Sequence, residues 1–158
     1  MLVGLISDTH GAVRAEVHRA FAGVEMILHA GDVGEGVYEE LAALAPLLAA
    51  RGNTDRGDPR LRKPAALDLE GFSIRVTHGD ELHHPDARRL AAKYAEQIVV
   101  YGHTHVRDAS WVDGRLFVNP GAAGSSRAPH PSVALLRLAA GARPEVEFVD
   151  LEARNARR

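Results

Sequence analysis

Two histidines separated by a single residue, His103 and His105, lie in the segment VVYGHTHVRD, directly after an apolar run and a glycine. On a helix, residues two apart lie about 200° apart around the axis and cannot easily share a site. On an extended backbone the same two side chains face one way, about 6.5 Å apart. A His-x-His pair of this kind can bind one metal ion, or one each of two ions about 3.5–4 Å apart.

Further candidate metal ligands stand in four other polar segments, each of which follows a short apolar run. In chain order the five segments read SDTHG from residue 7, GDVGE from 31, GNTD from 52, THGD from 77 and GHTH from 102. Asp32 and Asn53 each follow a glycine, whose lack of a Cβ atom lets a ligand approach the backbone. Together the segments supply three oxygen donors and four imidazoles: Asp8, His10, Asp32, Asn53, His78, His103 and His105.

Seven ligands, one of them shared, suit two divalent metal ions better than one. A nitrogen and oxygen donor set without sulfur favours Mn²⁺, with Zn²⁺, Fe or Ni²⁺ as alternatives, over Ca²⁺ and Mg²⁺. Because two carboxylates neutralise only half the charge of two divalent ions, the site would attract an anion such as phosphate. A water bridging two cations is expected to ionise near neutral pH, since one metal ion already lowers its pKa from 15.7 to about 7. Such a hydroxide is a nucleophile that needs no serine or cysteine.

The composition is that of an ordinary globular domain. Of the 158 residues, 46% are hydrophobic and 25% are charged, which argues against disordered and fibrous classes, and the length fits one core. The formal net charge of −2 provides no polycationic surface and therefore no strong nucleic-acid signature. The chain has no cysteine, which excludes disulfides, thiolate metal ligands and thiol nucleophiles.

No segment predicts export or membrane insertion. The opening residues, MLVGLISDTHG, lack the positively charged region of a signal peptide. The longest apolar run, 41–50, contains Pro46 and is much shorter than the roughly 20 residues that cross a bilayer. We therefore expect a cytoplasmic protein with no membrane partner.

The apolar runs before the polar segments predict strands, and some of the intervening segments predict helices. The five predicted strands are 2–7, 26–30, 47–51, 72–77 and 98–101. Apolar residues three and four apart predict helices at 13–24 and 87–94 and a weaker one at 37–45. Gly23 would help to end the first helix, and Asp86 would cap the second. The candidate ligands would then meet at the strand ends, where open α/β sheets bind ligands.

The second half of the chain predicts antiparallel hairpins. One turns at Glu70-Gly71, one at Asp113-Gly114, which is typical of a type I′ turn, and a third occupies 132–151. Alternating strands and helices followed by hairpins predict mixed sheets with helices outside. We predict a single domain over 1–158, of which 152–158 is a frayed tail.

The five polar segments, in this order, resemble the signature of the calcineurin-like metallophosphoesterases. The chain length and the later segment NPGAAGSSR resemble the small bacterial and archaeal phosphodiesterase branch of that family. The resemblance spans 8–127, most of the chain. One segment alone is a weak signal, but five in the family's order are highly specific.

This resemblance implies a four-layer α/β/β/α sandwich, made of two mixed β-sheets flanked by helices. It also implies that Asp8, His10 and His105 hold one ion. Asn53, His78 and His103 would hold the other, and Asp32 would bridge the two. The implied activity is metal-dependent hydrolysis of a small phosphodiester substrate by a metal-bridging hydroxide, with Asn53 and His103 near the phosphate.

Thr54 departs from the wider family pattern. Many members carry a histidine directly after the asparagine of the third segment, where it is thought to assist the leaving group. Threonine cannot act as a general acid at neutral pH, so substrates with poor leaving groups should react slowly. The small phosphodiesterase branch also lacks this histidine, which makes Thr54 a trait of the subgroup.

Other polar residues near the segments are weaker candidates. Asp80 stands where the fourth segment often reads histidine, and it joins Asp55 as a candidate for the catalytic machinery. Arg127 is a candidate for binding a phosphate oxygen, and His83 and His84 are candidates for touching substrate. For the remaining histidines we expect an exposed side chain at positions 18 and 130 and a packing or supporting role at position 29.

Two other functional classes share features with this sequence. A eukaryotic retromer subunit resembles this fold and serves mainly as a protein-binding scaffold, but the complete set of seven ligands favours an enzyme. Metal-dependent amidohydrolases also use His-x-His, but their barrel needs about 250 residues. A homo-oligomer is compatible with the sequence, which leaves the natural substrate open.

Overall fold

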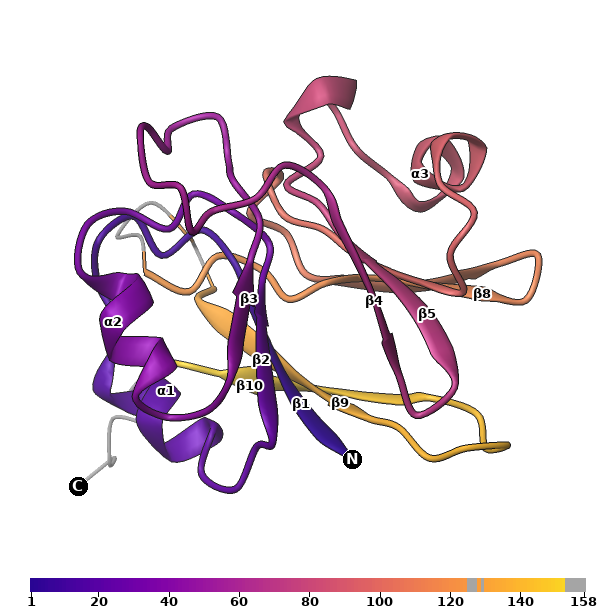
Figure 1. Ribbon diagram of the computed structural model, residues 1–158, viewed down its shortest axis with the longest axis horizontal. Coiled ribbons are helices and arrows are strands. Elements are labelled where there is room, and N and C mark those ends of the chain that lie inside the picture. The colour runs from indigo at the N-terminus through magenta and orange to yellow at the C-terminus, as the bar shows by residue number, and fades with distance from the viewer. Residues whose placement is uncertain (125–127, 129, 153–158) are drawn as a thin grey trace.

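The computed structural model describes residues 1–124, 128 and 130–152 (Figure 1). Its elements are β1 (Leu2–Ile6), α1 (Ala15–Ala20), β2 (Met26–His29), α2 (Val37–Ala42), β3 (Leu47–Ala49), β4 (Ala65–Leu69), β5 (Phe72–Val76), the 3₁₀ helix η1 (Asp80–Leu82), α3 (Ala87–Lys93), β6 (Ile98–Val100), β7 (Asp108–Val112), β8 (Arg115–Asn119), β9 (Ser132–Arg137) and β10 (Glu145–Asp150). The strands form two five-stranded sheets, of order β10-β9-β1-β2-β3 and β4-β5-β6-β8-β7.

The first sheet is mixed. Strands β1, β2 and β3 run parallel, whereas β9 pairs antiparallel with β1 and forms a hairpin with β10. After Leu2, all of β1 is buried, because the second sheet covers one face of the strand and helices cover the other. Because β1, β2 and β3 are parallel, their carboxyl ends lie at the same edge of the sheet, at the top in Figure 1.

The second sheet combines three parallel strands with two hairpins. Strands β5, β6 and β8 are parallel, and β4 and β7 pair antiparallel at the two edges. Both residues of each hairpin turn have positive φ: 51° and 83° at Glu70-Gly71, and 50° and 75° at Asp113-Gly114. This is the backbone that a type I′ turn requires, and the predicted hairpins are confirmed.

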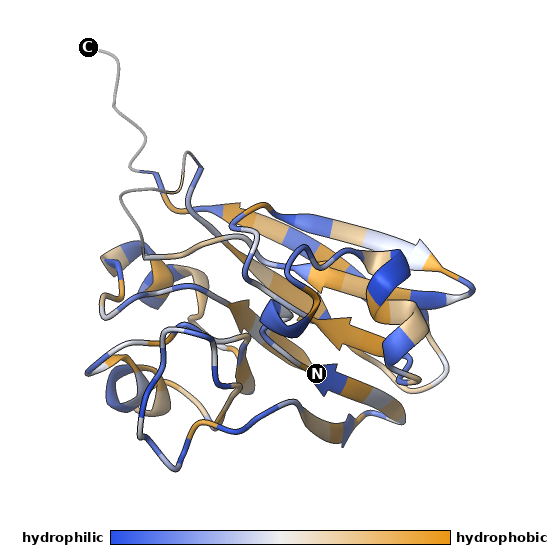
Figure 2. Ribbon diagram, turned by 90° about the horizontal axis from the view of Figure 1, so that it is seen from above, coloured by the Kyte–Doolittle hydropathy of each residue, from blue (hydrophilic) through white to orange (hydrophobic). Residues whose placement is uncertain are grey.

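Three hydrophobic clusters join the layers. One lies between the two sheets and includes Leu5, Val76 and Val118. A second packs α1 and α2 on the outer face of the first sheet, and a third packs α3 on the outer face of the second sheet. Figure 2 shows the hydrophobic residues concentrated on the strands and the polar residues in the loops. The predicted four-layer α/β/β/α sandwich is confirmed.

The predicted elements occur, but several are shorter than expected. The first helix spans α1 only, because Arg14 is extended at its N-terminus without a capping bond and Gly23 is left-handed with φ of 83°. At α3 the predicted cap is present, since the Arg89 amide donates a 2.9 Å hydrogen bond to the Asp86 carboxylate. The Asp86 side chain therefore caps the start of α3, whereas α1 begins without a side-chain cap.

Two predictions fall on residues that the structure does not describe. Arg127 and the tail from 153 onward lie outside the described residues. Among the helices within 1–124 and 130–152, none combines the length and the hydropathy needed to cross a membrane.

Candidate metal centre

The polar loops that follow β1 and β2 are joined by backbone hydrogen bonds. The amides of Asp8 and His10 donate to the carbonyls of Gly31 and Asp32, each at 3.0 Å. The loop that follows β6, in the other sheet, reaches the same place, because the His103 amide donates to Asp8 Oδ2 at 3.3 Å. The two sheets thus bring segments about 95 residues apart into one site.

One group of candidate ligands consists of Asp8, His10 and His105, whose donor atoms all lie within 4.8 Å of one another. His105 Nε2 lies 3.2 Å from Asp8 Oδ1, and His10 Nε2 lies 3.9 Å from the same oxygen. The His10 and His105 rings meet edge to face, with centroids 5.7 Å apart. This is the set of residues that the family resemblance assigns to one ion.

A second group consists of Asp8, Asp32 and His78, all buried and again within 4.8 Å. His78 Nε2 lies 3.3 Å from Asp32 Oδ2 and 3.9 Å from Asp8 Oδ1. His103 adjoins this group, since its Nδ1 lies 3.2 Å from His78 Nε2. The structure therefore adds a feature absent from the sequence prediction: Asp8 belongs to both groups.

Asp32 also lies between the two groups. Its Oδ2 is 3.3 Å from His78 Nε2 and 3.8 Å from His10 Nε2, whereas its Oδ1 accepts a 3.0 Å hydrogen bond from the Thr54 amide. One oxygen is thus held by the backbone and the other faces imidazoles of both groups. This geometry is what a bridging carboxylate needs.

Asn53 is the candidate ligand that the structure places at the margin. It is exposed in the loop after β3, and it lines a cavity with Asp80 beside the cluster. Its neighbour Thr54 makes the backbone contact with Asp32. The structure brings six of the seven candidate ligands together and leaves Asn53 next to them.

The donors fit divalent metal ions. Asp8 Oδ1 is buried and has no hydrogen-bond partner, although three imidazole nitrogens lie within 3.9 Å of it. A buried carboxylate oxygen without a partner is costly, and a bound cation would satisfy it. The ring of His78 is oriented for ligation, because its Nδ1 donates a 2.7 Å hydrogen bond to the Ala30 carbonyl and leaves Nε2 facing the cluster.

In this cluster, neighbouring charges together shift the pKa values of the carboxylates and of His78 more than burial does. Burial alone would raise the pKa values of Asp8 and Asp32, but neighbouring imidazoles hold both below their ordinary values. Burial alone would lower the pKa of His78, but the two carboxylates outweigh it and raise that pKa to about 9. The nearby Asp8 carboxylate, 3.2 Å from His105 Nε2, raises the pKa of His105 in the same way. An entering metal ion would therefore have to displace protons.

The backbone of the site is strained. Five of the candidate ligands have the positive φ values that L-residues rarely adopt: Asp8, His10, Asp32, His103 and His105, between 49° and 72°. A left-handed residue other than glycine costs about 1–2 kcal/mol. Strain of this kind persists only where surrounding contacts hold it, and it clusters at functional sites.

Glycines let the loops approach the carboxylates. A Cβ atom at Gly52 would lie 2.1 Å from Asp32 Oδ1, and one at Gly102 would lie 2.0 Å from Ser7 Oγ and 2.8 Å from Asp8 Oδ2. Real Cβ atoms essentially never come so close. The glycines that precede Asn53 and His103 are therefore needed for the packing of the site itself.

Asp55 holds two of the loops together. Its buried carboxylate accepts hydrogen bonds from the amides of Val33, Gly34 and Gly52, at 2.9–3.2 Å. These contacts connect the loop that carries Asp32 with the loop that carries Asn53. Asp55 therefore positions the two loops. The sequence had suggested a place for Asp55 in the catalytic machinery, but its carboxylate is occupied by backbone amides.

His29 supports the site from beneath, as the sequence predicts. Gly31 donates its amide to His29 Nδ1 at 3.1 Å, so the ring proton lies on Nε2 and points to Thr9 Oγ1 at 2.9 Å. Thr9 in turn donates to the Val33 carbonyl at 2.6 Å. Burial lowers the pKa of His29 to about 4, which keeps the ring neutral and this chain of hydrogen bonds intact.

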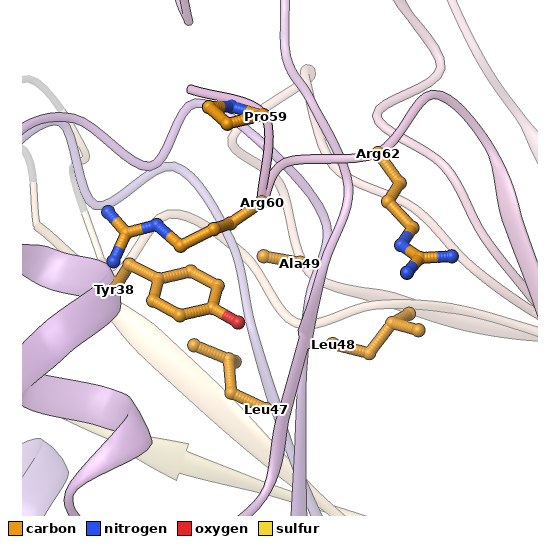
Figure 3. A pocket seen from close by; sticks show the side chains of 7 residues that line it. All are labelled: Tyr38, Leu47, Leu48, Ala49, Pro59, Arg60 and Arg62. Carbon is orange, nitrogen blue, oxygen red and sulfur yellow. The ribbon is translucent and has the colours of Figure 1, made fainter.

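The weaker candidates lie at the periphery. Asp80 is half-buried in η1, and His83 and His84 are exposed at its end; none of the three belongs to either group of donors. The side chains of His18 and His130 are 40% and 80% exposed, as predicted. A separate cavity of about 520 Å³ at the edge of β3 contains none of the candidate ligands (Figure 3).

We expect Gly52→Ala to weaken metal binding by about 10- to 100-fold, the usual effect of disturbing a residue that supports a ligand. The added methyl group would displace Asp32, and elemental analysis after dialysis against limiting Mn²⁺ measures the result. The matched control is Gly141→Ala, which has φ of 75° and open space around it. Both variants lose stability, but equal metal contents would contradict the role of Gly52.

We expect His29 to make the metal-free protein lose stability as the pH falls. Its pKa rises from about 4 in the folded state to the ordinary 6.5 on unfolding, so between these values the unfolded chain binds the extra proton. The integrated loss between pH 7 and pH 5 is about 2 kcal/mol. Because His78, with its raised pKa, gains stability over the same range, the test is a comparison. In urea unfolding with a chelator, the loss should be about 2 kcal/mol larger in the wild type and in His130→Gln than in His29→Gln. Parallel curves for all three proteins would exclude a neutral His29.

Comparisons with known proteins agree with this geometry. A model of the calcineurin-like phosphoesterase superfamily domain matches residues 1–141. A Methanothermobacter thermautotrophicus protein named probable metallophosphoesterase is 35% identical over 151 residues, which cover 87% of this chain and 86% of that protein. A Methanocaldococcus jannaschii protein named phosphodiesterase is 30% identical over 142 residues, which cover 77% and 83%.

A solved structure shows the same fold. The crystal structure of Entamoeba histolytica Vps29 complexed with Zn²⁺ matches with a TM-score of 0.79 and 25% identity, over 96% of this chain and all of that one. The family model covers most of the sequence, and the curated relatives match at similar length. The chain therefore belongs to the calcineurin-like phosphoesterase superfamily.

Proposed function

We propose that this phosphoesterase is a dinuclear phosphodiesterase, with Mn²⁺ as the favoured metal. The observation that carries the proposal is the position of Asp32 Oδ2, which faces imidazoles of both donor groups at 3.3 and 3.8 Å. Two divalent ions bound here would supply the Lewis acidity that activates water and stabilises charge on a phosphate. The relative from Methanocaldococcus jannaschii that is named phosphodiesterase supports the same reaction class.

The proposed ligand sets keep the assignment that the family resemblance implies. Asp8, His10 and His105 would hold one ion. Asn53, His78 and His103 would hold the other, with Asp32 shared. Asn53 is exposed beside the cluster, which also suits a contact with the bound phosphate.

The reaction does not need a nucleophile from the protein. The chain has no cysteine. Two buried hydroxyls beside the cluster act as hydrogen-bond donors, Ser7 Oγ to Asp8 Oδ2 at 2.5 Å and Thr9 Oγ1 to the Val33 carbonyl at 2.6 Å. Both are buried against the ligand loops. A water molecule is therefore the proposed nucleophile.

Position 54 provides no proton donor for the leaving group. Thr54 is exposed, and its backbone amide is used to hold Asp32. Its hydroxyl is far too weak an acid to protonate an alkoxide at neutral pH. The proposed enzyme should therefore prefer substrates whose leaving oxygen is stable as an anion.

We expect Asp32→Asn to lose activity by at least about 100-fold and to lose one or both metal ions. The change removes one of two carboxylates and weakens the only side chain that we propose to bridge the ions. Metal content by elemental analysis and hydrolysis of bis(p-nitrophenyl) phosphate, with Mn²⁺, Zn²⁺, Fe²⁺ and Ni²⁺ tested separately, give the result. Asp68→Asn removes the same charge from an exposed position on β4 and serves as the control.

The wild type and the control should bind two ions per chain and hydrolyse the diester. Fewer than one tightly bound ion per chain would overturn the dinuclear site. Full metal content and full turnover in Asp32→Asn would overturn the bridge. Two bound ions without hydrolysis of any phosphodiester would leave the protein-binding scaffold as the better interpretation.

We expect turnover to depend steeply on the pKa of the leaving group and to become less steep in Thr54→His. A positioned general acid contributes about 10²–10⁴-fold, and a misplacement of about 1 Å costs about 10²-fold, so a gain of tenfold or more on alkyl diesters is expected. Thr54→Ala, which adds no acid, is the matched control. A wild-type rate that is the same for aryl and alkyl diesters would indicate another acid, with Asp80, His83 and His84 the first candidates, or a rate set by product release.

A further inference from the structure

A basic cavity lies directly beside the candidate metal centre. It has a volume of about 320 Å³, and its wall includes three cations, Arg51, Lys63 and Lys93, and two acids, Asp80 and Glu81. Asn53, a proposed ligand, also lines the cavity. The loops that follow β3 and β5, which carry Asn53 and His78, therefore both contribute to its wall.

Two of these cations are held side by side by the backbone. Ala50 and Arg62 form a parallel β-bridge, with hydrogen bonds from the Arg51 amide to the Arg62 carbonyl at 2.5 Å and from the Arg62 amide to the Ala49 carbonyl at 3.1 Å. Arg51 and Lys63 are the next residues along the two paired segments. Both residues line the cavity beside Asn53.

The neighbouring cations are not neutralised within the protein. Neither Arg51 nor Lys63 has a carboxylate oxygen within 4.0 Å among the described residues, and like charges on paired strands repel. Lys93, by contrast, lies 3.5 Å from Glu81, whose carboxylate also accepts a 2.6 Å hydrogen bond from Tyr94. Asp80 alone remains to offset Arg51 and Lys63, so this part of the cavity has an excess of positive charge.

A second cavity is lined by Arg60 and Arg62, and the charge of Arg60 is neutralised within the protein (Figure 3). There the Arg60 guanidinium lies over the Tyr38 ring, 4.3 Å from its centroid, and it pairs with Asp58 and Glu39, each at 2.7 Å. Arg62 lines this cavity and not the one beside Asn53. The positive charge of Arg60 is thus neutralised by two carboxylates of the protein. The positive charges of Arg51 and Lys63 remain available to a ligand.

We propose that Arg51 and Lys63 bind a second phosphate group of the substrate, so that the enzyme selects phosphodiesters carrying a phosphate monoester on one of the two alcohols. The inference rests on the proposed function, since it places the reacting phosphate at the metal centre and the second phosphate in the basic cavity. Two adjacent cations match the two negative charges of a phosphate monoester. Binding energy from this remote group would hold the reacting phosphate in position.

Binding to the Mn²⁺-loaded protein tests the inference without relying on turnover. The probes are thymidine 5′-monophosphate and thymidine 3′,5′-bisphosphate, which differ only in the second phosphate. We expect calorimetry to show about tenfold tighter binding of the bisphosphate, with an advantage that shrinks as salt is added. The double variant Arg51→Gln/Lys63→Gln should lose this advantage, and Asp80→Asn should increase it.

Arg62→Gln is the matched control, because it removes a neighbouring positive charge from the other cavity. It should keep the wild-type ratio of the two dissociation constants. Equal binding of the two nucleotides by the wild type would overturn the inference. An equal loss of the advantage in Arg62→Gln would also overturn it, since the effect would then reflect overall charge.

Hydrolysis provides the separate test of the proposed function. The substrates are the p-nitrophenyl ester of thymidine 5′-monophosphate and its 3′-phosphorylated counterpart, which share one leaving group. We expect the second phosphate to lower KM about tenfold with little change in kcat. Hydrolysis of both esters at equal kcat/KM would overturn the inference alone. Tighter binding of the bisphosphate without hydrolysis of either ester would support the basic subsite and overturn the phosphodiesterase.

Discussion

The arrangement of the site depends on one buried carboxylate. Asp8 is completely buried at the end of β1, and its Oδ2 accepts hydrogen bonds from the Ser7 hydroxyl and the His103 amide. Its Oδ1 has no hydrogen-bond partner and faces imidazoles from three loops. A buried charge is costly unless an opposite charge lies beside it. The fold therefore needs cationic density next to Asp8, from protonated histidines or from a metal ion.

The loops around Asp8 have a strained backbone. Five candidate ligands adopt left-handed backbone conformations, and glycines allow contacts that a Cβ atom would block. Two clamps hold the strained loops in place, namely the Asp55 carboxylate with its three backbone amides and the His29–Thr9 pair. Both clamps connect residues that are about 20 positions apart in the chain. These contacts between distant residues hold each loop in a conformation that its local sequence alone would not favour.

The same geometry relates the chemistry to substrate choice. Thr54 offers an amide to Asp32 but no acid to a leaving group, so chemistry at the site relies on the metal ions and on positioning. An unneutralised pair of cations next to Asn53 can supply positioning through a part of the substrate that does not react. The proposed enzyme would thus combine a limited catalytic apparatus with binding energy from a second phosphate.

The sequence by itself determined the strands, the hairpin turns, the polar segments and the residues that meet at the centre. These features are local, because apolar runs, turn pairs such as Asp113-Gly114 and glycines before ligands are set by neighbouring residues. Only the tertiary structure decided that Asp8 belongs to both donor groups, that Asp55 binds backbone amides and that Arg51 lies beside Lys63. Such contacts join residues that are distant in the chain. Which of these side chains meet depends on how the two sheets and their loops pack together.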